Sequence, residues 1–381
     1  MSLFLLSFFL IYGGTHFYFF LKMRGALSPG MPASLVLTLF LLLMVFSPIL
    51  VRLLENEGLD TYARSVAYIG YIWMGFLFLF LSLSLVIDFY HGFMHAAAFL
   101  LQMDLSFLIL SRRVALFLPL VWGVGTALYG YFEALDIKSE KVSITTPKIP
   151  LAVGKITIVQ VSDVHLGLIV RKERLAKIIA LIRASSPDIL ISTGDLVDGQ
   201  INSMTGLAEL LNEIKPRYGK FAVTGNHEIY AGLRQTLAFT GQSGFRVLRG
   251  ESVVAGGMIN IAGVDDPVIA RIDHKPLTSE KILLEGLSRE RFTLLLKHRP
   301  AIDRESMGLF DLQLSGHVHK GQIFPFNLLT HLFYPVKMGY SRYPSGSSLY
   351  VSRGTGTWGP PIRFLAPPEV TVIELRHGER E

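Results

Sequence analysis

The stretch SGHVHKG (residues 315–321) places two histidines, His317 and His319, one residue apart at the end of an apolar run. In a strand, residues i and i+2 point to the same face, so both imidazoles would project together from the strand end. Comparable polar residues end four other apolar runs: Asp163 with His165, Asp195, Asn226 with His227, and His298. Carboxylate, amide and imidazole groups are the ligands that transition-metal ions prefer. The five strand ends therefore predict a metal site.

Four of these strand ends carry a glycine-containing motif, namely SDVHLG, GDLVDG, GNHE and GHVH. Glycine lets the backbone turn sharply and brings ligands close together. One such Asp alone is more often a helix cap or a turn residue, and a lone His such as His298 is more often structural. The motifs in succession favour a site for two divalent cations, such as Mn, Fe, Zn, Co or Ni, bridged by an Asp.

The strands that position these residues are expected at 155–163, 188–195, 220–226, 292–298 and 311–319, with helices at 171–184 and 203–214. Strands that alternate with helices of about a dozen residues predict parallel pairing in an α/β sheet. Ligands of such sheets bind outside the carboxyl ends of the strands. Residues 155–381 are long enough to form one domain with its own core.

The first third of the chain is strongly apolar. Four stretches of about 20 residues are each long enough to cross a bilayer as a helix: 3–21, 33–51, 67–87 and 114–132. A fifth candidate, 93–110, contains His95, Gln102 and Asp104, which are costly in hydrocarbon, so it could instead lie in the interface or re-enter. Stretch 3–21 lacks the basic start of a signal peptide. We predict an α-helical transmembrane bundle of four or five spans over 1–132, a linker at 133–154 and the catalytic domain after it.

Charge and composition add little to this organisation. The formal net charge of +6 fits an anionic substrate or lipid surface, but such balances are common. The chain has no Cys, which excludes disulfides and thiolate metal sites. A bias of six basic residues against four around the spans predicts a multi-pass protein of the inner membrane with a cytoplasmic catalytic domain. His91, His95 and Asp104 form either a functional polar cluster or a set of helix-end residues at headgroup level.

The ordered motifs DVH, GDLVD, GNHE, a lone His and GHVH resemble those of the calcineurin-like metallophosphoesterases, over roughly residues 153–376. The later stretches GHVHKGQ and LYVSRGTGTWGPPIRFLAPPEVTVIELR resemble the membrane-associated branch of the YkuE and YaeI type. Val318 departs from the Thr usual in that branch, at a position that is not a ligand. The resemblance implies a four-layer α/β domain, a β-sandwich flanked by helices, and a metal-dependent phosphoric ester hydrolase.

The resemblance also implies a role for each site residue. The first of two divalent metal ions (Mn, Fe or Zn) would be held by Asp163, His165, Asp195 and His319, and the second by Asp195, Asn226, His298 and His317, with Asp195 bridging. A water between the ions would attack phosphorus in line. His227 would be the general acid, or would only orient Asn226, and Asp198 and Glu228 would support the ligands.

The substrate is less defined by the residues. Some family members cleave the pyrophosphate of UDP-diacylglucosamine, and others act on cyclic nucleotides, phosphoproteins or nucleic acids. The number of spans favours the lipid bilayer as a partner and a lipid-linked or nucleotide-diphosphate substrate, and we expect no nucleic-acid partner; the oligomeric state is not indicated. Five basic residues could contact phosphate, although each alone is more often a solvated charge: Arg171, Lys320, Arg342, Arg353 and Arg363.

Two questions stay open at this stage. The apolar stretch FPFNLLTHLFYPVKMGY (324–340) is either a flap that dips into the membrane interface or part of the core. The chain could also be a sensor or transporter-associated protein with a regulatory metal domain, or a non-catalytic binding module. Few ionisable residues lie within the spans, which disfavours a transporter, and every ligand position is filled, which disfavours the binding module.

Overall fold

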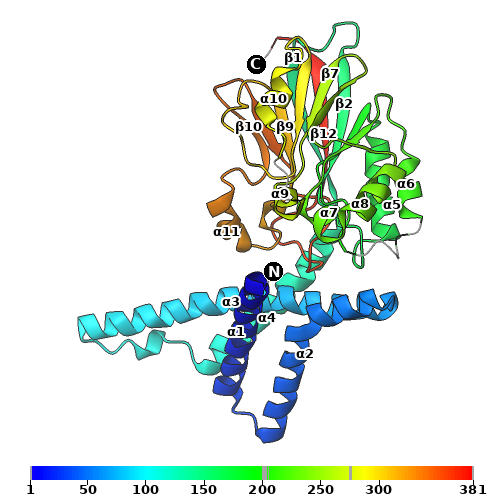
Figure 1. Cartoon of the computed structure of the whole chain (residues 1–381). Coiled ribbons are helices and arrows are strands. Elements are labelled where there is room, and N and C mark those ends of the chain that lie inside the picture. The colour runs from blue at the N-terminus through cyan, green and yellow to red at the C-terminus, as the bar shows by residue number, and fades with distance from the viewer. Residues whose placement is uncertain (1, 200–203, 205, 274–276, 380–381) are drawn as a thin grey trace. The chain divides into compact units, whose positions relative to one another are not determined.

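The computed structural model describes residues 2–199, 204, 206–273 and 277–379 (Figure 1). The chain divides into two compact units, residues 1–132 with 359–362 and residues 133–358 with 363–381. The first unit is helical, and the second contains two β-sheets and their covering helices. Each unit has its own buried apolar clusters, so each is described separately.

The first unit is built from long apolar helices. They are α1 (Ser2–Leu27), α2 (Met31–Asn56), α3 (Asp60–Leu101) and α4 (Arg112–Leu135), with a short 3-10 turn, η1 (Ser106–Leu108), before α4. Phe19 of α1, Leu41 of α2, Phe80 of α3 and Leu116 of α4 pack into one buried cluster. Gln102 adopts a left-handed backbone conformation directly after α3 and ends that helix.

The prediction of four or five spans is higher than the structure supports. Among the described residues, three helical segments are long and apolar enough to cross a membrane: 31–56, 60–101 and 106–135. The predicted span 3–21 lies in α1, which is not among these three, and the side chains at its start lie outside the described residues. The fifth candidate, 93–110, is not a separate helix, because its first half continues α3 and its second half is a loop with η1. At 42 residues α3 is ~63 Å long, about twice the hydrocarbon thickness.

The polar residues near the end of α3 serve the loop that follows it. His91 Nε2 accepts a hydrogen bond from the Leu110 amide at 3.1 Å, and Asp104 Oδ1 accepts one from the Ser106 amide at 2.9 Å. Elsewhere in this unit, Lys22 of α1 forms an ion pair with Asp88 of α3, and Tyr18 donates to the same carboxylate at 2.6 Å. These contacts join α1 to α3 and close the α3–α4 connection.

The second unit contains two six-stranded sheets. The first has the order β1-β12-β2-β3-β4-β5, with β1 (Lys138–Thr146), β2 (Lys155–Val161), β3 (Ile189–Ser192), β4 (Lys220–Ala222), β5 (Arg246–Val247) and β12 (Glu369–His377). The second has the order β10-β11-β9-β8-β7-β6, with β6 (Glu251–Ala255), β7 (Ile259–Gly263), β8 (Phe292–Leu296), β9 (Leu312–Ser315), β10 (Gly339–Arg342) and β11 (Ser348–Val351). β2, β3 and β4 pair in parallel, as the alternation with helices predicted, and so do β8 and β9.

The alternation of side chains along the strands produces four layers. Ile156 and Ile158 of β2 face the second sheet and pack in one cluster with Leu294 and Leu314. Val159 and Val161 point to the other face of the first sheet. They pack against the helices that cover it, α5 (Lys172–Ala184), α6 (Leu207–Asn212) and α8 (Leu233–Gln242) (Figure 1). The second sheet carries α10 (Glu280–Glu285) on its outer face. The α/β fold and the β-sandwich flanked by helices are therefore confirmed.

Two predicted segments differ in extent from the structure. The segment 133–154 was expected to be a linker, but it contains β1, which pairs in parallel with β12 over nine residues. Charged and apolar residues alternate in β1, as in an edge strand with one solvent-exposed face. This pattern is a weaker sequence signal for a strand than the continuous apolar runs of the buried strands. The predicted helix at 203–214 is shorter, as α6, and its start falls partly on residues outside the described ones.

Candidate metal centre

The predicted ligands lie at the carboxyl ends of five strands, three from one sheet and two from the other. Asp163 and His165 follow β2, Asp195 follows β3, Asn226 begins α7 (Asn226–Tyr230) after β4, His298 follows β8, and His317 and His319 follow β9. Because the two sheets pack face to face, their strand ends meet at one edge of the sandwich. The structure therefore brings all seven predicted ligands into one region, although they are up to 156 residues apart in sequence.

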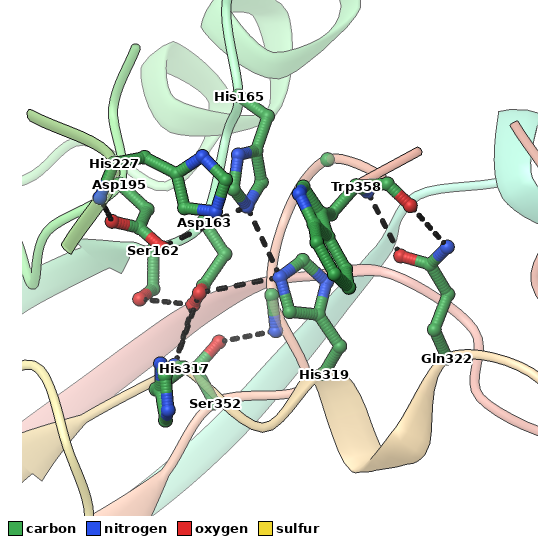
Figure 2. Close-up of polar contacts among 12 residues, drawn as sticks. Ser162, Asp163, His165, Asp195, His227, His317, His319, Gln322, Ser352 and Trp358 are labelled. Atoms are coloured by element: carbon green, nitrogen blue, oxygen red, sulfur yellow. Dashed lines mark hydrogen bonds and ion pairs between the residues drawn. The ribbon is translucent and has the colours of Figure 1, made fainter. Parts of the chain in front are cut away.

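The first group of ligands consists of Asp163, His165 and His319. Their nearest ligand atoms all lie within 4.8 Å of one another. His319 Nε2 is 3.3 Å from Asp163 Oδ1 and 3.2 Å from His165 Nε2, as the dashed lines in Figure 2 show. All three side chains are buried. One carboxylate and two imidazoles converging on a point form a donor set suited to a transition-metal ion.

The second group consists of Asp195, His298 and His317. Asp195 Oδ2 lies 3.1 Å from His298 Nε2, and His298 Nε2 lies 3.2 Å from His317 Nδ1. The same Asp195 oxygen is 3.9 Å from His165 Nε2 of the first group. This carboxylate thus lies between the two groups, as a bridging ligand would.

Asn226 supplies an independent test of whether these residues fit a cation. Its Oδ1 atom is buried and has no hydrogen-bond partner among the described residues. A buried amide oxygen without a partner is destabilising by about 1–3 kcal/mol. A cation beside Asp195 would satisfy this oxygen, and the mixed carboxylate, amide and imidazole donors suit such an ion. The residues therefore fit the predicted metal-binding role.

Most ligand residues have a backbone conformation that non-glycine residues avoid. The φ angles are 53° at Asp163 and His165, 51° at Asp195, 71° at His317 and 48° at His319. Non-glycine residues in the left-handed region cost about 1–3 kcal/mol each and cluster at functional sites. The surrounding strands and hydrogen bonds hold these residues in place. Such local strain is a sign of a site selected for geometry at the expense of stability.

Glycines allow the ligand loops to approach each other. A Cβ atom at Gly316 would overlap the Ser162 and Asp163 side chains, and one at Gly225 would overlap Asp195. The GHVH and GNHE motifs thus need their glycines because a ligand from another strand occupies the space of a side chain.

The electrostatics of the site favour positive charge between the carboxylates. Burial lowers the pKa of His298, but the Asp195 carboxylate beside it raises that pKa to about 10. Burial and the neighbouring His298 lower the pKa of His317 to about 3, and burial together with His227 lowers that of His165 to about 3. The neutral imidazoles therefore offer lone pairs, while the proton on His298 occupies the place that a cation would take.

A second layer of hydrogen bonds fixes the ligands. Glu228 accepts hydrogen bonds from four main-chain amides, including that of Asp195 at 2.9 Å and that of Gly225 at 2.7 Å. His298 Nδ1 donates a hydrogen bond to the Thr193 carbonyl at 2.8 Å, which turns Nε2 towards Asp195 and the site. Arg363 is fully buried and lies 3.0 Å from His319 Nδ1, and it also donates to the Gly356 and Arg353 carbonyls.

His227 lies at the edge of the site and is paired with Asp198. Its Nδ1 is 2.8 Å from Asp198 Oδ1, and its ring meets the His165 ring edge to face at 4.7 Å. Burial lowers the pKa of His227, but the charges of Asp195 and Asp198 raise it to about 9. The Asp198 carboxylate therefore holds the ring at Nδ1 and favours its protonated form.

The basic residues proposed to bind phosphate are placed differently from one another. Arg353 forms ion pairs with Glu140 at 2.8 Å and with Glu369 at 2.5 Å, so two carboxylates already engage its guanidinium. Arg363 is buried against the main chain. Arg342 is exposed on β10, and Arg171 and Lys320 are half-buried. A phosphate contact stays a prediction for all five residues.

Two features of the site did not come from the ligand motifs. The Trp358 indole contacts the His227 ring, with ring centroids 5.8 Å apart, and the Gln322 side chain forms hydrogen bonds with both the amide and the carbonyl of Trp358 (Figure 2). Tyr334 contacts the His317 ring edge to face at 5.5 Å. An aromatic residue inside a loop rich in Gly and Pro, GTGTWGPP, is the sequence signal that points to Trp358.

Residues 156–321 match the family model of the calcineurin-like phosphoesterases. A metallophosphoesterase of Aquifex aeolicus is 40% identical to the chain over 249 residues, which cover 65% of this chain and 95% of that protein. The chain therefore belongs to the calcineurin-like metallophosphoesterase family and is a metal-dependent phosphoric ester hydrolase.

Two further relatives are similar to the chain over a comparable length. The metallophosphoesterase YkuE of Bacillus subtilis is 33% identical over 268 residues, covering 65% of this chain and 90% of that protein. A transmembrane protein with a metallophosphoesterase domain from Danio rerio is 33% identical over 268 residues, covering 66% of this chain and 60% of that protein. The prediction of the family and of its membrane-associated branch is thus confirmed.

Proposed function

We propose that this phosphoesterase uses two divalent cations, Mn, Fe or Zn, to hydrolyse a phosphoester or pyrophosphate bond of a lipid-linked substrate at the membrane surface. The observation that carries the lipid part of the proposal is the exposed apolar helix α11 (Phe326–Phe333), which follows the last metal ligand directly. The catalytic part rests on the two groups of ligands that share Asp195.

Each part of the site has a task in this reaction. Bound cations would supply an acidified water and would neutralise the charge that develops on the phosphate oxygens. The chain itself holds the ligands with Glu228 and Arg363 and keeps His165 and His317 neutral. His227, protonated near neutral pH, donates the proton from Nε2 to the leaving oxygen while Asp198 holds its ring.

Helix α11 does not belong to the core. None of its described side chains is buried, and Leu332 and Phe333 are 77% and 78% exposed. Phe326, Leu328 and Leu329 are also exposed. Of the stretch 324–340, the helix thus lies outside the core, whereas Tyr334 and Val336 after it pack against the buried cluster of Val318, Leu349 and Val351. An apolar patch of this kind on a soluble surface marks a site of interaction with a protein or a membrane.

The rest of the chain favours the lipid bilayer as the partner of the exposed apolar side chains of α11. Three helical segments of the same chain are long and apolar enough to span a membrane, so a bilayer is available to this domain. Helices that expose Phe and Leu bury these apolar side chains at the boundary between the lipid headgroups and the acyl chains. Lys337, which donates to the Asn327 carbonyl, places a positive charge beside the helix for anionic headgroups.

The helix is also coupled to the metal centre. Tyr334, the residue that ends α11, contacts the ring of His317. A lipid that enters along α11 would therefore bring its phosphate to the metal ligands without leaving the membrane. A multi-pass arrangement in the inner membrane with a cytoplasmic catalytic domain is part of this proposal, on the strength of the basic residues that flank the spans.

The test compares Leu332→Gln on α11 with Ile282→Gln on α10, a matched change at an apolar side chain that is 72% exposed elsewhere. Full-length protein with Mn²⁺ is assayed on bis(p-nitrophenyl) phosphate in solution and on a nucleoside-diphosphate-linked diacylglycerol in phosphatidylcholine vesicles. We expect Leu332→Gln to lower only the hydrolysis of the vesicle-borne lipid, by about fivefold or more. Equal loss on both substrates, or equal loss in both variants, would contradict the role of α11.

A further inference from the structure

Two exposed aromatic side chains flank the general acid His227. The Trp358 and Tyr230 rings meet the His227 ring edge to face, with centroids at 5.8 and 5.7 Å. Trp358 is 53% exposed and Tyr230 is 58% exposed. Each ring therefore packs against His227 and leaves much of its own surface open to solvent.

Trp358 is held by both ligand loops. In the residues before it, the Thr355 amide donates to the Ser162 carbonyl at 2.7 Å and the Gly356 amide donates to the Asp163 carbonyl at 2.9 Å. A Cβ atom at Gly356 would overlap the main chain of the Asp163 loop, so this strand of chain lies directly on the loop that carries the first ligands.

The second anchor comes from the loop of the last ligands. Gln322, three residues after His319, donates from Nε2 to the Trp358 carbonyl at 2.7 Å and accepts from the Trp358 amide at 2.9 Å through Oε1 (Figure 2). The main chain of Trp358 is thus fixed relative to the loops that carry Asp163 and His319, and the contact with His227 orients the indole. An exposed Trp held in this way loses little conformational entropy when a ligand binds to it.

Tyr230 is fixed from another direction. It is the last residue of α7, the short helix that begins with Asn226 and His227, so it lies one helical turn after the general acid. The two aromatic rings come from segments far apart in sequence and converge on the same histidine. Such convergence of exposed, positioned rings is typical of a surface that stacks on a flat ligand ring.

We propose that Trp358 and Tyr230 form a subsite for a flat ring on the leaving group, such as a nucleobase. The inference rests on the proposed function, because it places the ring next to the residue that protonates the leaving oxygen. This subsite would select a substrate whose phosphate is joined to a nucleoside over one whose phosphate is joined to a group without a flat ring. Gln322 acts as a positioning residue that holds the indole.

The experiment compares two competitive inhibitors, adenosine 5′-monophosphate and ribose 5-phosphate, which present the same phosphate and sugar and differ in the base. Their inhibition constants are measured against bis(p-nitrophenyl) phosphate with the Mn²⁺-loaded, full-length protein in detergent. The variants are Trp358→Ala, Trp358→Phe and Tyr230→Ala, with Trp122→Ala in α4 as the matched control. We expect the nucleotide to bind about tenfold more tightly than the sugar phosphate in the wild type.

The ratio of the two inhibition constants should fall below about twofold in Trp358→Ala, stay partly preserved in Trp358→Phe, and be unchanged in Trp122→Ala. Gln322→Ala should reduce the ratio by an intermediate amount. A wild-type ratio near one, with the ester still hydrolysed, would overturn the subsite and leave the phosphoesterase proposal standing. Failure of the wild type to hydrolyse the ester would overturn the proposed function and this inference with it.

Discussion

The substitution Glu228→Gln tests whether the fixed position of Asp195 depends on a single buried carboxylate. Glu228 Oε1 accepts from the amides of Leu196 at 2.6 Å and Val197 at 3.3 Å, and Oε2 accepts from those of Asp195 and Gly225. A glutamine has one carbonyl oxygen and one amide nitrogen of nearly the same shape. The side-chain nitrogen of the glutamine would replace one of the two oxygens. It carries hydrogens, so it cannot accept hydrogen bonds from the two main-chain amides that this oxygen had accepted from.

The magnitude follows from this count. Two of the four hydrogen bonds to the carboxylate are lost, and each leaves a buried amide unpaired, at about 1–3 kcal/mol apiece. The free energy of unfolding should therefore fall by about 2–6 kcal/mol, a large part of the 5–15 kcal/mol typical of a domain. Because Asp195 has a strained φ of 51°, its loop should relax when these bonds are lost. Metal affinity should then fall by about 10–100-fold.

The assay is thermal unfolding of the catalytic domain in the full-length protein, followed by titration of the metal-free protein with Mn²⁺. Glu213→Gln is the matched control, because Glu213 is exposed and pairs only at the surface with Arg183. This control should change the free energy of unfolding by less than about 1 kcal/mol. If Glu228→Gln kept wild-type affinity for Mn²⁺, the view that Glu228 positions Asp195 would be refuted, even if the variant were less stable.

Two further changes test the assigned roles. Asp195→Asn should reduce the bound metal to below about a tenth of the wild-type amount and abolish hydrolysis while the protein still inserts into membranes; metal analysis and membrane fractionation check this, and surviving activity would count against a bridging carboxylate. His227→Asn should lower kcat by about 10²–10⁴-fold with the metal content unchanged, as steady-state kinetics beside metal analysis would show, whereas a parallel loss of metal would make His227 a supporting residue instead of the general acid.

The candidate site could be predicted from sequence to the level of individual residues because its ligands follow short buried strands with glycine turns. Asp163, Asn226 and His317 are each recognisable from a local motif, and parallel strand ends bring such motifs together. The lone His298 has no such motif, and only its place after an apolar run between the other blocks identified it. The left-handed conformations of the ligands were not predictable, since Asp and His rarely adopt them without support from the surrounding fold.

The rest of the fold was harder to predict, for reasons of local pattern. The strand pattern alone suggested one α/β sheet, and only the family resemblance implied the β-sandwich. The strands before His298 and His317 belong to the second sheet, and the periodicity of a buried strand does not say which sheet it joins. β1 was missed because an edge strand is only half apolar. The fifth span was counted since one 42-residue helix is long enough to contain two apolar stretches, 67–87 and the start of 93–110. The other excess span is 3–21, in α1, which is not among the three supported segments.

The position of the specificity elements in the chain follows from the same architecture. The family match ends at residue 321, directly after the last ligands, so it covers the groups that any two-metal phosphoesterase needs. Helix α11 and the Trp358 loop both lie beyond that point, and both return to the ligands, through Tyr334 on His317 and through Gly356 on Asp163. Since neither segment supplies a metal ligand, their sequences can vary without loss of the cations. We therefore propose that the segment after His319 selects the substrate, with α11 meeting the membrane and the Trp358 loop meeting a ring of the leaving group.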